Sequence, residues 1–415
     1  SILETIQMVF LVWIIFFVSL LANVLAEKCW PNYEHKDILP ACALGEDSKG
    51  IWVNITETSA HHHRKELLKH FLFNGPGEAT FFRQVWVPHD CSYHRFTRES
   101  LFYFAEKMVK SNPKDFPQGF LQIVVFADSG TRGILCGITH IEGGSEIFGP
   151  NLNEICGNRT RKAISSGNTD QIFNHTINPY LKISFVYTLA GIEADFSLQM
   201  TVLTKIKPHA IIYNTGVWHF VDLHNKHEHH VQDPTCDSIV AEKRADRLMA
   251  KNAPLMKQLS DLANQIGSKT RLIYRNMHYN SFYGALCFDQ LIEDWIHEEK
   301  RQNETFRWEI FDTRRISKYV WEESNFDGFH YSREHHMWTY EEHLRYYQHY
   351  LTDFGKLEMQ LAQSLLNYFY NNLIVAESKK SLRFPEKVLE FEVDCSNKVF
   401  HRTLFPRNEQ NQTNV

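Results

Sequence analysis

The stretch VVFADSGTRG, residues 124–133, joins an apolar run to a segment with helical character. The run FLQIVVFA (120–127) is almost entirely apolar, which is typical of a strand buried on both faces of a sheet. Asp-Ser-Gly follows at once, and TRGILCGITHI (131–141) then has the pattern of a short helix. Ser129 therefore stands between a strand and a helix, where a serine is either a helix cap or a nucleophile.

The segments that follow keep alternating between strand-like and helix-like patterns. LKISFVYTLA (181–190) and KPHAIIYNTG (207–216) are predicted strands, and a long helix is predicted over about Asp237–Gln265 with Pro254 inside it. Such alternation predicts an α/β fold, in which a mostly parallel sheet is flanked by helices. The remaining predicted elements are the strand TRLIYRNM (270–277), the helix CFDQLIEDWIHEEK (287–300), the strand RWEIFDTRRI (307–316) and a helix from Tyr340 to about Tyr370.

The main domain is expected over residues 119–372, with a tail at 373–415. Residues 27–118 are only weakly periodic, although RESLFYFAEKMVKS (98–111) predicts an amphipathic helix and GEATFFRQVWVP (77–88) a short strand. No Pro-rich or Gly/Ser-rich linker separates them from the main domain. They are therefore interpreted as an N-terminal lead-in that packs on the main domain.

The overall composition is that of a globular protein. Of 415 residues, 43% are hydrophobic and 13% aromatic, which is enough to bury a sizeable core. The 44 Lys and Arg residues nearly balance the 49 Asp and Glu residues, so no nucleic-acid partner is expected.

The N-terminal segment 1–26 is predicted to be directed to a membrane. The run from Met8 to Ala26 is interrupted only by Ser19 and Asn23 and is long enough to span a bilayer as a helix of about 20 residues. Its end, Val24-Leu25-Ala26, also fits the small-residue pattern of a signal-peptidase site. A signal anchor and a cleaved signal peptide both remain open.

Either interpretation sends the rest of the chain to the ER or Golgi lumen, as a single-pass membrane protein, or out of the cell. The eight cysteines form no Cys-x-x-Cys pair, which suits disulfides in an oxidising compartment better than zinc binding. Five Asn-x-Thr triplets are potential N-glycosylation sites: they begin at Asn54, Asn158, Asn174, Asn303 and Asn411.

Two further segments place polar residues where chemistry can occur. Asn214, in Tyr213-Asn214-Thr215-Gly216, closes a predicted strand, where its side chain can donate to an oxyanion or simply form a turn. In the loop Phe326-Asp327-Gly328-Phe329-His330, an Asp precedes a His by three residues and can orient its imidazole. Chemistry in parallel sheets gathers at the carboxyl ends of strands, where we expect these residues to meet.

A strand-end serine, a strand-end Asn-x-Gly and a late Asp-x-x-His, in this order, form the signature of the SGNH, or GDSL-type, hydrolase superfamily. ADSGTR (127–132) resembles the G-D-S-x-x-R block of its PC-esterase branch, which includes the trichome-birefringence-like polysaccharide O-acetyltransferases and the sialate O-acetyltransferase. NTGVW (214–218) is similar to the N-T-G-H-W block of the plant members, and DGFH (327–330) to the D-x-x-H block. The resemblance covers about residues 120–372 and implies a three-layer α/β/α fold.

The resemblance implies a role for each matching residue. Ser129 would be the nucleophile, His330 the general base and Asp327 its orienting carboxylate. The Ser129 N–H and Asn214 would stabilise the oxyanion, and Arg132 would assist them unless it is only a solvated or salt-bridged helix residue. The family also uses a loop glycine, for which both Gly191 and the pair Gly143-Gly144 qualify. Trp218 lies close in sequence to this site and could stack on a sugar, as Trp338 and Tyr340 could.

This chain departs from the family pattern at two points. Ala127 replaces the first glycine of G-D-S, and the cysteine-flanked ending of the plant enzymes is absent. Two groups of histidines suggest a metal, but no H-E-x-x-H frames them, and we predict no metal site: they are His61-His62-His63, and His219, His224, His227, His229 and His230.

We therefore expect a serine-dependent acyl-transfer enzyme of the secretory pathway, with an O-acetyltransferase acting on glycan hydroxyls as the leading hypothesis. No cofactor is expected, although a donor such as acetyl-CoA can serve as co-substrate. The acceptor would be a glycan or polysaccharide. An O-acetylesterase, a catalytically inactive glycan-binding relative and a metal-dependent hydrolase remain as alternatives, because the covalent step alone does not separate a transferase from an esterase.

Overall fold

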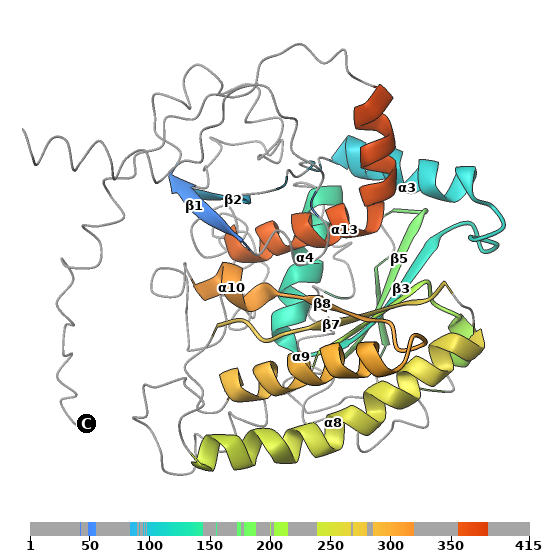
Figure 1. Cartoon of the computed structure of the whole chain (residues 1–415). Coiled ribbons are helices and arrows are strands. Elements are labelled where there is room, and N and C mark those ends of the chain that lie inside the picture. Colours follow the sequence, from blue (N-terminus) through green and yellow to red (C-terminus); the bar gives the residue numbers. More distant parts are fainter. Residues whose placement is uncertain are drawn as a thin grey trace, which may run out of the picture.

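A computed structural model gives the architecture of the chain (Figure 1). The part of the chain that it describes comprises residues 42, 49–54, 84–88, 91, 94, 96, 98–143, 155, 172–175, 178–187, 200, 203–214, 239–266, 269–279, 285–318 and 356–380.

A six-stranded sheet forms the centre of the molecule, with strand order β4-β5-β3-β6-β7-β8. Five of these strands run parallel, while β4 pairs antiparallel with β5 at one edge. This mixed, mostly parallel sheet confirms the predicted α/β class. The strands are β3 (Leu121–Ala127), β4 (Ile172–His175), β5 (Leu181–Tyr187), β6 (Ala210–Tyr213), β7 (Arg271–Arg275) and β8 (Trp308–Phe311).

The central strand β3 is buried along its whole length, which explains its almost entirely apolar sequence. Its side chains alternate between two separate hydrophobic clusters. Ile123 and Val125 belong to one cluster, and Val124 and Phe126 to the other. The sheet therefore carries a core on each face.

Helices cover both faces of the sheet (Figure 1). The cluster containing Ile123 and Val125 includes side chains of α3 (Arg98–Ser111), α4 (Ser129–Gly143), α10 (Thr313–Lys318) and α13 (Lys356–Lys380). The opposite cluster includes side chains of α8 (Ile239–Ile266) and α9 (Ala285–Gln302).

Helix α4 lies very close to α13 because two glycines face that helix. A Cβ built on Gly137 would come within 2.9 Å of the Ala362 Cβ and 3.0 Å of the Glu358 carbonyl oxygen. One built on Gly133 would lie 3.0 Å from Glu358 Cγ. Because Gly133 and Gly137 have no side chain, α4 and α13 can pack closely against each other on this side of the core.

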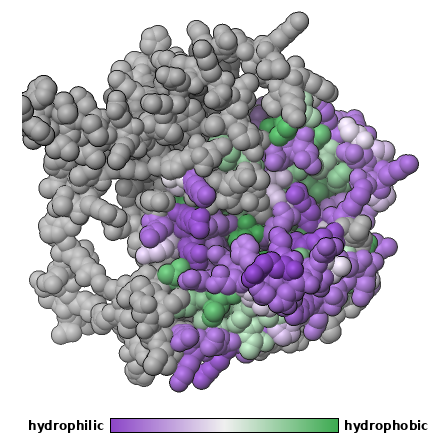
Figure 2. Space-filling model, viewed as in Figure 1, coloured by the Kyte–Doolittle hydropathy of each residue, from purple (hydrophilic) through white to green (hydrophobic). Residues whose placement is uncertain are grey.

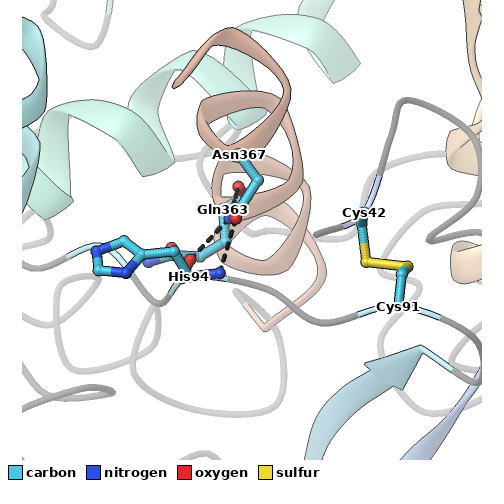
Figure 3. The surroundings of a disulfide bond; sticks show 5 residues. All are labelled: Cys42, Cys91, His94, Gln363 and Asn367. Atoms are coloured by element: carbon cyan, nitrogen blue, oxygen red, sulfur yellow. Dashed lines mark hydrogen bonds between the residues drawn. A yellow bond between two sulfur atoms is a disulfide. The ribbon is translucent and has the colours of Figure 1, made fainter. Parts of the chain in front are cut away.

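An earlier part of the chain is joined to α13 by paired hydrogen bonds (Figure 3). The backbone of His94 donates to Asn367 and accepts from it, each at 2.7 Å. Phe96 exchanges the same pair with Gln363, at 2.7 and 2.9 Å. Nearby, Cys42 and Cys91 form a buried disulfide. The antiparallel strands β1 (Gly50–Asn54) and β2 (Gln84–Pro88) also belong to this part of the chain.

Cys136 and Cys287 are disulfide-bonded as well. With Cys42 and Cys91, they show that cysteines of this chain are used in disulfides, as their scattered spacing suggests.

Most predicted elements are present, with differences at their ends. The long helix containing Pro254 forms as α8, and α3 has the predicted bounds. Strands β1 and β4 were not predicted, since five-residue and four-residue edge segments carry little periodic signal. Helix α13 continues to Lys380, and the described part of it begins at Lys356.

One predicted strand is wrong in its second half. The segment over residues 307–316 leaves the sheet after Phe311, and α10 begins at Thr313. The Asn276 side chain stabilises the first turn of α10, because its Oδ1 accepts the backbone N–H groups of Thr313 at 2.7 Å and Arg314 at 3.1 Å. Asp312 adds a local N-cap, since its Oδ1 accepts the backbone N–H of Arg315 at 3.2 Å, whereas the bonds from the distant Asn276 leave no local signal.

The viewed surface of the described residues is mainly hydrophilic, with small separate hydrophobic areas (Figure 2). Tyr103 is the large hydrophobic side chain exposed among the described residues, at 49%. No described helix has both the length and the apolar character needed to cross a membrane, and segment 1–26 lies outside the described range.

Candidate functional site

Ser129 is the first residue of α4, immediately beyond the carboxyl end of β3. Its neighbour Asp128 caps this helix: Asp128 Oδ1 accepts the backbone N–H groups of Gly130 at 3.0 Å and Thr131 at 3.3 Å. The side chain of Ser129 is therefore not needed for the cap. In the Asp-Ser-Gly turn, the helix cap is therefore Asp128. A chemical role for Ser129 remains open.

Ala127 fits this turn without the glycine that the family pattern has. It is the last residue of β3 and remains in register with Tyr187 on β5. Among the described residues other than glycine, Lys207 alone has a positive φ. Ala127 thus has a backbone conformation that an L-residue readily adopts, so the turn does not need a glycine at this position.

Asn214 directly follows β6, the strand adjacent to β3. Its backbone N–H donates to the Phe126 carbonyl at 2.9 Å, which extends the pairing of the two strands to their carboxyl ends. Its side-chain Nδ2 donates to the Arg275 carbonyl at 2.7 Å. Asn214 is fully buried, and its Oδ1 has no hydrogen-bond partner among the described residues. The structure thus brings Asn214 and Ser129 to the same edge of the sheet.

This edge contains the point where the connections of the sheet change direction. After β3 the chain adds β5 on one side, and it then returns to add β6 on the other. The helices that follow adjacent strands at such a point diverge to opposite faces and leave a crevice, where α/β proteins bind ligands. Ser129 and Asn214 flank this point.

Arg275, at the end of β7, is a residue of this site that sequence reasoning missed. Its Nη1 donates to Thr131 Oγ1 at 3.0 Å and lies 3.5 Å from Asp128 Oδ1. Its Nη2 lies 3.2 Å from the position that a Cβ on Gly130 would take. The guanidinium, only 1% exposed, therefore lies directly against the Asp128–Thr131 turn. The sequence did contain one indication of a special role for Arg275, because an arginine is unusual in an otherwise apolar strand.

Burial sets the electrostatics of this arginine. Desolvation lowers the pKa of Arg275 from its ordinary value, and the carboxylates of Asp128 and Asp289 act in the opposite direction. An arginine so lowered still carries its positive charge at neutral pH. The first turn of α4 therefore has two sources of positive potential, the guanidinium and the helix N-terminus.

His278 also lies beside this turn, three residues after the end of β7. Its Cδ2 is 3.3 Å from the position of a Cβ on Gly130, and the residue is 4% exposed. A side chain at position 130 would therefore crowd Arg275 and His278, and the glycine avoids this close contact. His278 was not singled out because the chain has 23 histidines and no local motif marks this one.

A buried polar network supports the loop that carries His278. The backbone N–H of Met277 donates to Asp289 on α9, at 3.0 Å from Oδ2, and the Tyr274 hydroxyl donates to Asp289 Oδ1 at 3.0 Å. Arg314 on α10 lies 3.7 Å from Asp289 and 3.2 Å from Glu293. Asp289 thus ties β7, α9 and α10 together behind the site.

Burial raises the pKa of Asp289 to about 8, and the nearby guanidinium of Arg314 offsets only part of this effect. Burial likewise raises the pKa of Glu293. Although burial of Arg314 lowers its pKa, the carboxylates of Asp289 and Glu293 raise it further, so the net shift is upward. The network is therefore sensitive to pH.

Arg132 is 1% exposed, so the interpretation as a solvated helix residue is wrong. Its backbone N–H donates to the Asp128 carbonyl at 3.2 Å in the first turn of α4. Its role as an oxyanion-stabilising residue stays a prediction.

The other predicted site residues lie outside the described part of the chain. They stay predictions: Asp327, His330, Gly191, Gly144 and Trp218. The two histidine groups also lie outside it, and within the described ranges no three His, Cys, Asp or Glu side chains are grouped so as to hold a metal ion.

Models of known protein families and curated protein sequences give no match to this chain.

Proposed function

We propose that the chain is a serine-dependent acyl-transfer enzyme with an SGNH-type α/β/α fold, and that it transfers acetyl groups to glycan hydroxyls. The observation that carries this proposal is the position of Ser129 at the switch point of the sheet, beside Asn214, while Asp128 fills the role of helix cap. A serine in that position is free of the cap role and lies where ligands bind in α/β folds.

The proposed reaction begins when Ser129 Oγ attacks the carbonyl carbon of an acetyl donor. His330 accepts the hydroxyl proton, and Asp327 orients its imidazole. The tetrahedral intermediate collapses to an acetyl-serine, and the leaving group of the donor departs with the proton from His330. A sugar hydroxyl then attacks the acetyl carbon and gives its proton to His330, the bond from that carbon to Ser129 Oγ breaks, and Oγ takes the proton back from His330.

The oxyanion of the intermediate needs hydrogen-bond donors near Ser129. As the family resemblance implies, we assign this role to the backbone N–H of Ser129, whereas Asp128 accepts the N–H groups of Gly130 and Thr131. The Asn214 amide has two N–H groups, and one of them is used by the Arg275 carbonyl. The second is assigned to the oxyanion, together with Arg132 and the N–H of Gly191.

The proposed acceptor is a glycan, with Trp218 as the ring on which a sugar stacks, and acetyl-CoA is one possible donor. We further propose that the chain acts in the ER or Golgi lumen or outside the cell, since cysteines at positions 42, 91, 136 and 287 are in disulfides. If water replaces the sugar hydroxyl, the same acetyl-serine yields an O-acetylesterase.

The test has two steps and uses the full chain from a secretory host. Labelling with a fluorophosphonate, followed by peptide mapping, should mark Ser129. Incubation with p-nitrophenyl acetate and a mixture of mono- and oligosaccharides should then give acetylated sugar in excess of free acetate. Labelling without sugar acetylation would leave the esterase. No labelling of Ser129 would overturn the proposal in favour of a non-catalytic glycan-binding protein.

A further inference from the structure

Two of the five Asn-x-Thr triplets begin at residues whose side chains the structure describes, Asn174 and Asn303. In each triplet, the asparagine amide nitrogen is the potential attachment point for an N-linked glycan. The surroundings of the two amides differ greatly. The sequence alone does not distinguish these two triplets. Their surroundings predict that one is glycosylated and the other is not.

Asn303 lies in an exposed turn. It directly follows α9, and its backbone N–H still donates to the Glu299 carbonyl at 2.8 Å. Asn303, Glu304 and Thr305 are all exposed, whereas Phe306 is buried and its N–H donates to the Asn303 carbonyl at 3.0 Å. The turn is thus held at both ends while its three triplet residues face solvent.

The side chain of Asn303 is oriented by Thr305, the hydroxyl residue of its own triplet. Both the backbone N–H and the hydroxyl of Thr305 donate to Asn303 Oδ1, at 2.9 and 2.7 Å. The carboxamide oxygen is therefore held towards the protein, and Nδ2 has no acceptor among the described residues. This arrangement leaves the reactive atom of the triplet accessible.

The location of Asn303 is compatible with a bulky modification. The turn precedes β8, so it lies at the amino end of that parallel strand, whereas Ser129 and Asn214 follow the carboxyl ends of β3 and β6. A glycan on Asn303 would therefore project from the edge of the sheet opposite the candidate site. Access to Ser129 would stay open.

Asn174 has the opposite surroundings. It lies within β4 in register with Ser184 of β5, and its Oδ1 accepts the Ser184 hydroxyl at 2.9 Å. Gln122 of β3 donates to the same Ser184 oxygen at 3.2 Å, so three strands are linked across one face of the sheet. The middle residue of the triplet, His175, is fully buried and bonded to Glu142. Asn174 itself is half-buried, and its triplet is fixed within a paired strand beside the buried His175, so it is less accessible to glycosylation than the exposed turn at Asn303.

We propose that Asn303 is N-glycosylated and that Asn174 stays unmodified in the folded protein. The donor class is a lipid-linked oligosaccharide pyrophosphate. A bond forms between Nδ2 and C1 of the first sugar as the bond from C1 to the pyrophosphate oxygen breaks. The lipid pyrophosphate leaves with the electron pair, and the amide nitrogen loses one proton. This proposal rests on the secretory routing proposed above and is independent of acyl transfer.

The experiment uses the full chain, secreted from a eukaryotic host and treated with peptide N-glycosidase in heavy-oxygen water. This treatment converts a glycosylated Asn to a labelled Asp, which peptide mass mapping detects. We expect label at Asn303 and none at Asn174. An unlabelled Asn303 would overturn the proposal, whether or not other triplets are labelled, and so would a labelled Asn174 in correctly folded protein.

Matched variants separate glycosylation from folding. Thr305→Ala removes the triplet and should abolish the label at Asn303, together with one glycan step in gel mobility. Glu304→Gln changes an exposed residue of the same turn but keeps the triplet, so it should retain both. Loss of the label in both variants would contradict the assigned mechanism.

Discussion

At the scale of single residues, Asp128 and Ser129 are neighbours with different predicted roles. Asp128 caps α4 and faces the buried guanidinium of Arg275. Ser129→Ala should abolish acylation and destabilise the protein less than the loss of Asp128, because it removes neither the Asp128 cap nor the contact between Asp128 and Arg275.

Asp128→Ala serves as the matched variant. It should destabilise the protein by about 2 kcal/mol or more, since loss of a cap costs about 0.5–2 kcal/mol and Arg275 would remain buried without its carboxylate. Urea denaturation of both variants checks these values. A Ser129→Ala variant as unstable as Asp128→Ala would indicate that the serine is mainly structural.

Arg275 is a positioning residue in this account, since it acts on the turn that carries Ser129. Arg275→Lys keeps the charge but replaces the planar guanidinium, whose Nη1 contacts Thr131 and Asp128, with a compact ammonium on a flexible stem. We expect kcat for p-nitrophenyl acetate to fall at least about tenfold with little change in KM, because misplacement of a reacting group impairs chemistry more than binding.

Arg271→Lys is the control for this prediction, because Arg271 is the exposed first residue of the same strand. It should leave kcat unchanged. Equal losses in the two variants, or a loss in Arg275→Lys confined to KM, would contradict the positioning role.

The sequence predicted that Ser129 and Asn214 lie at the carboxyl edge of the sheet, because each follows an apolar run that ends in a turn. It marked Arg275 only as an arginine within an apolar strand, and it did not show that Arg275 and His278 contact the turn at Ser129. These side chains reach the first turn of α4 across β6, from the end of β7, and such contacts depend on strand order. Strand order results from long-range packing and leaves no local pattern in the sequence.

At the scale of elements, the contact between α4 and α13 predicts different effects for two similar substitutions. Gly137→Ala should destabilise the protein by about 1–3 kcal/mol, because the new Cβ would meet the Ala362 side chain and the Glu358 backbone, which cannot move apart without shifting a helix. Gly133→Ala meets only the flexible Glu358 side chain.

Gly133→Ala is therefore the internal control. Both substitutions gain about 1 kcal/mol of helix propensity, so the difference between them isolates packing. Thermal and urea denaturation measure it. Equal stability of the two variants would mean that the helices are less tightly packed than the distances indicate.

The network around Asp289 predicts how stability changes with pH. Its pKa is raised from 3.8 to about 8 in the folded protein, so the folded state retains a proton that the unfolded state loses. The contribution of this group to stability is fully present below about pH 4 and is lost as pH rises towards 8. Asp289→Asn should therefore flatten the fall in unfolding free energy between about pH 5 and 8.

Asp294→Asn, at an exposed position of the same helix, makes the same change in charge and should leave the pH dependence as in the wild type. Denaturation curves across this pH range decide the question. An unchanged slope in Asp289→Asn would show that Asp289 is ionised in the folded protein.

At the scale of the whole molecule, the alternation of apolar runs and helical periods was sufficient to predict a mostly parallel sheet flanked by helices. The antiparallel edge strand β4 and the helix α10 were missed for physical reasons. The first has only four residues, and the second has only six and is capped by Asn276 from another part of the chain as well as by the local Asp312. A sequence pattern records burial and period, whereas these features depend on tertiary contacts.

The arrangement of the whole molecule also determines where Ser129 lies. A buried core on each face fixes the sheet, and the strand order brings Ser129, Asn214 and Arg275 to one edge. The central claim is that Ser129 at this edge becomes acylated.

The most direct test is intact-mass analysis of the secreted, deglycosylated protein after brief incubation with p-nitrophenyl acetate, beside its Ser129→Ala variant. The account predicts a gain of one acetyl group in the wild type, which peptide mapping assigns to Ser129, and no gain in the variant. Equal acetylation of both proteins, or none in either, would contradict it.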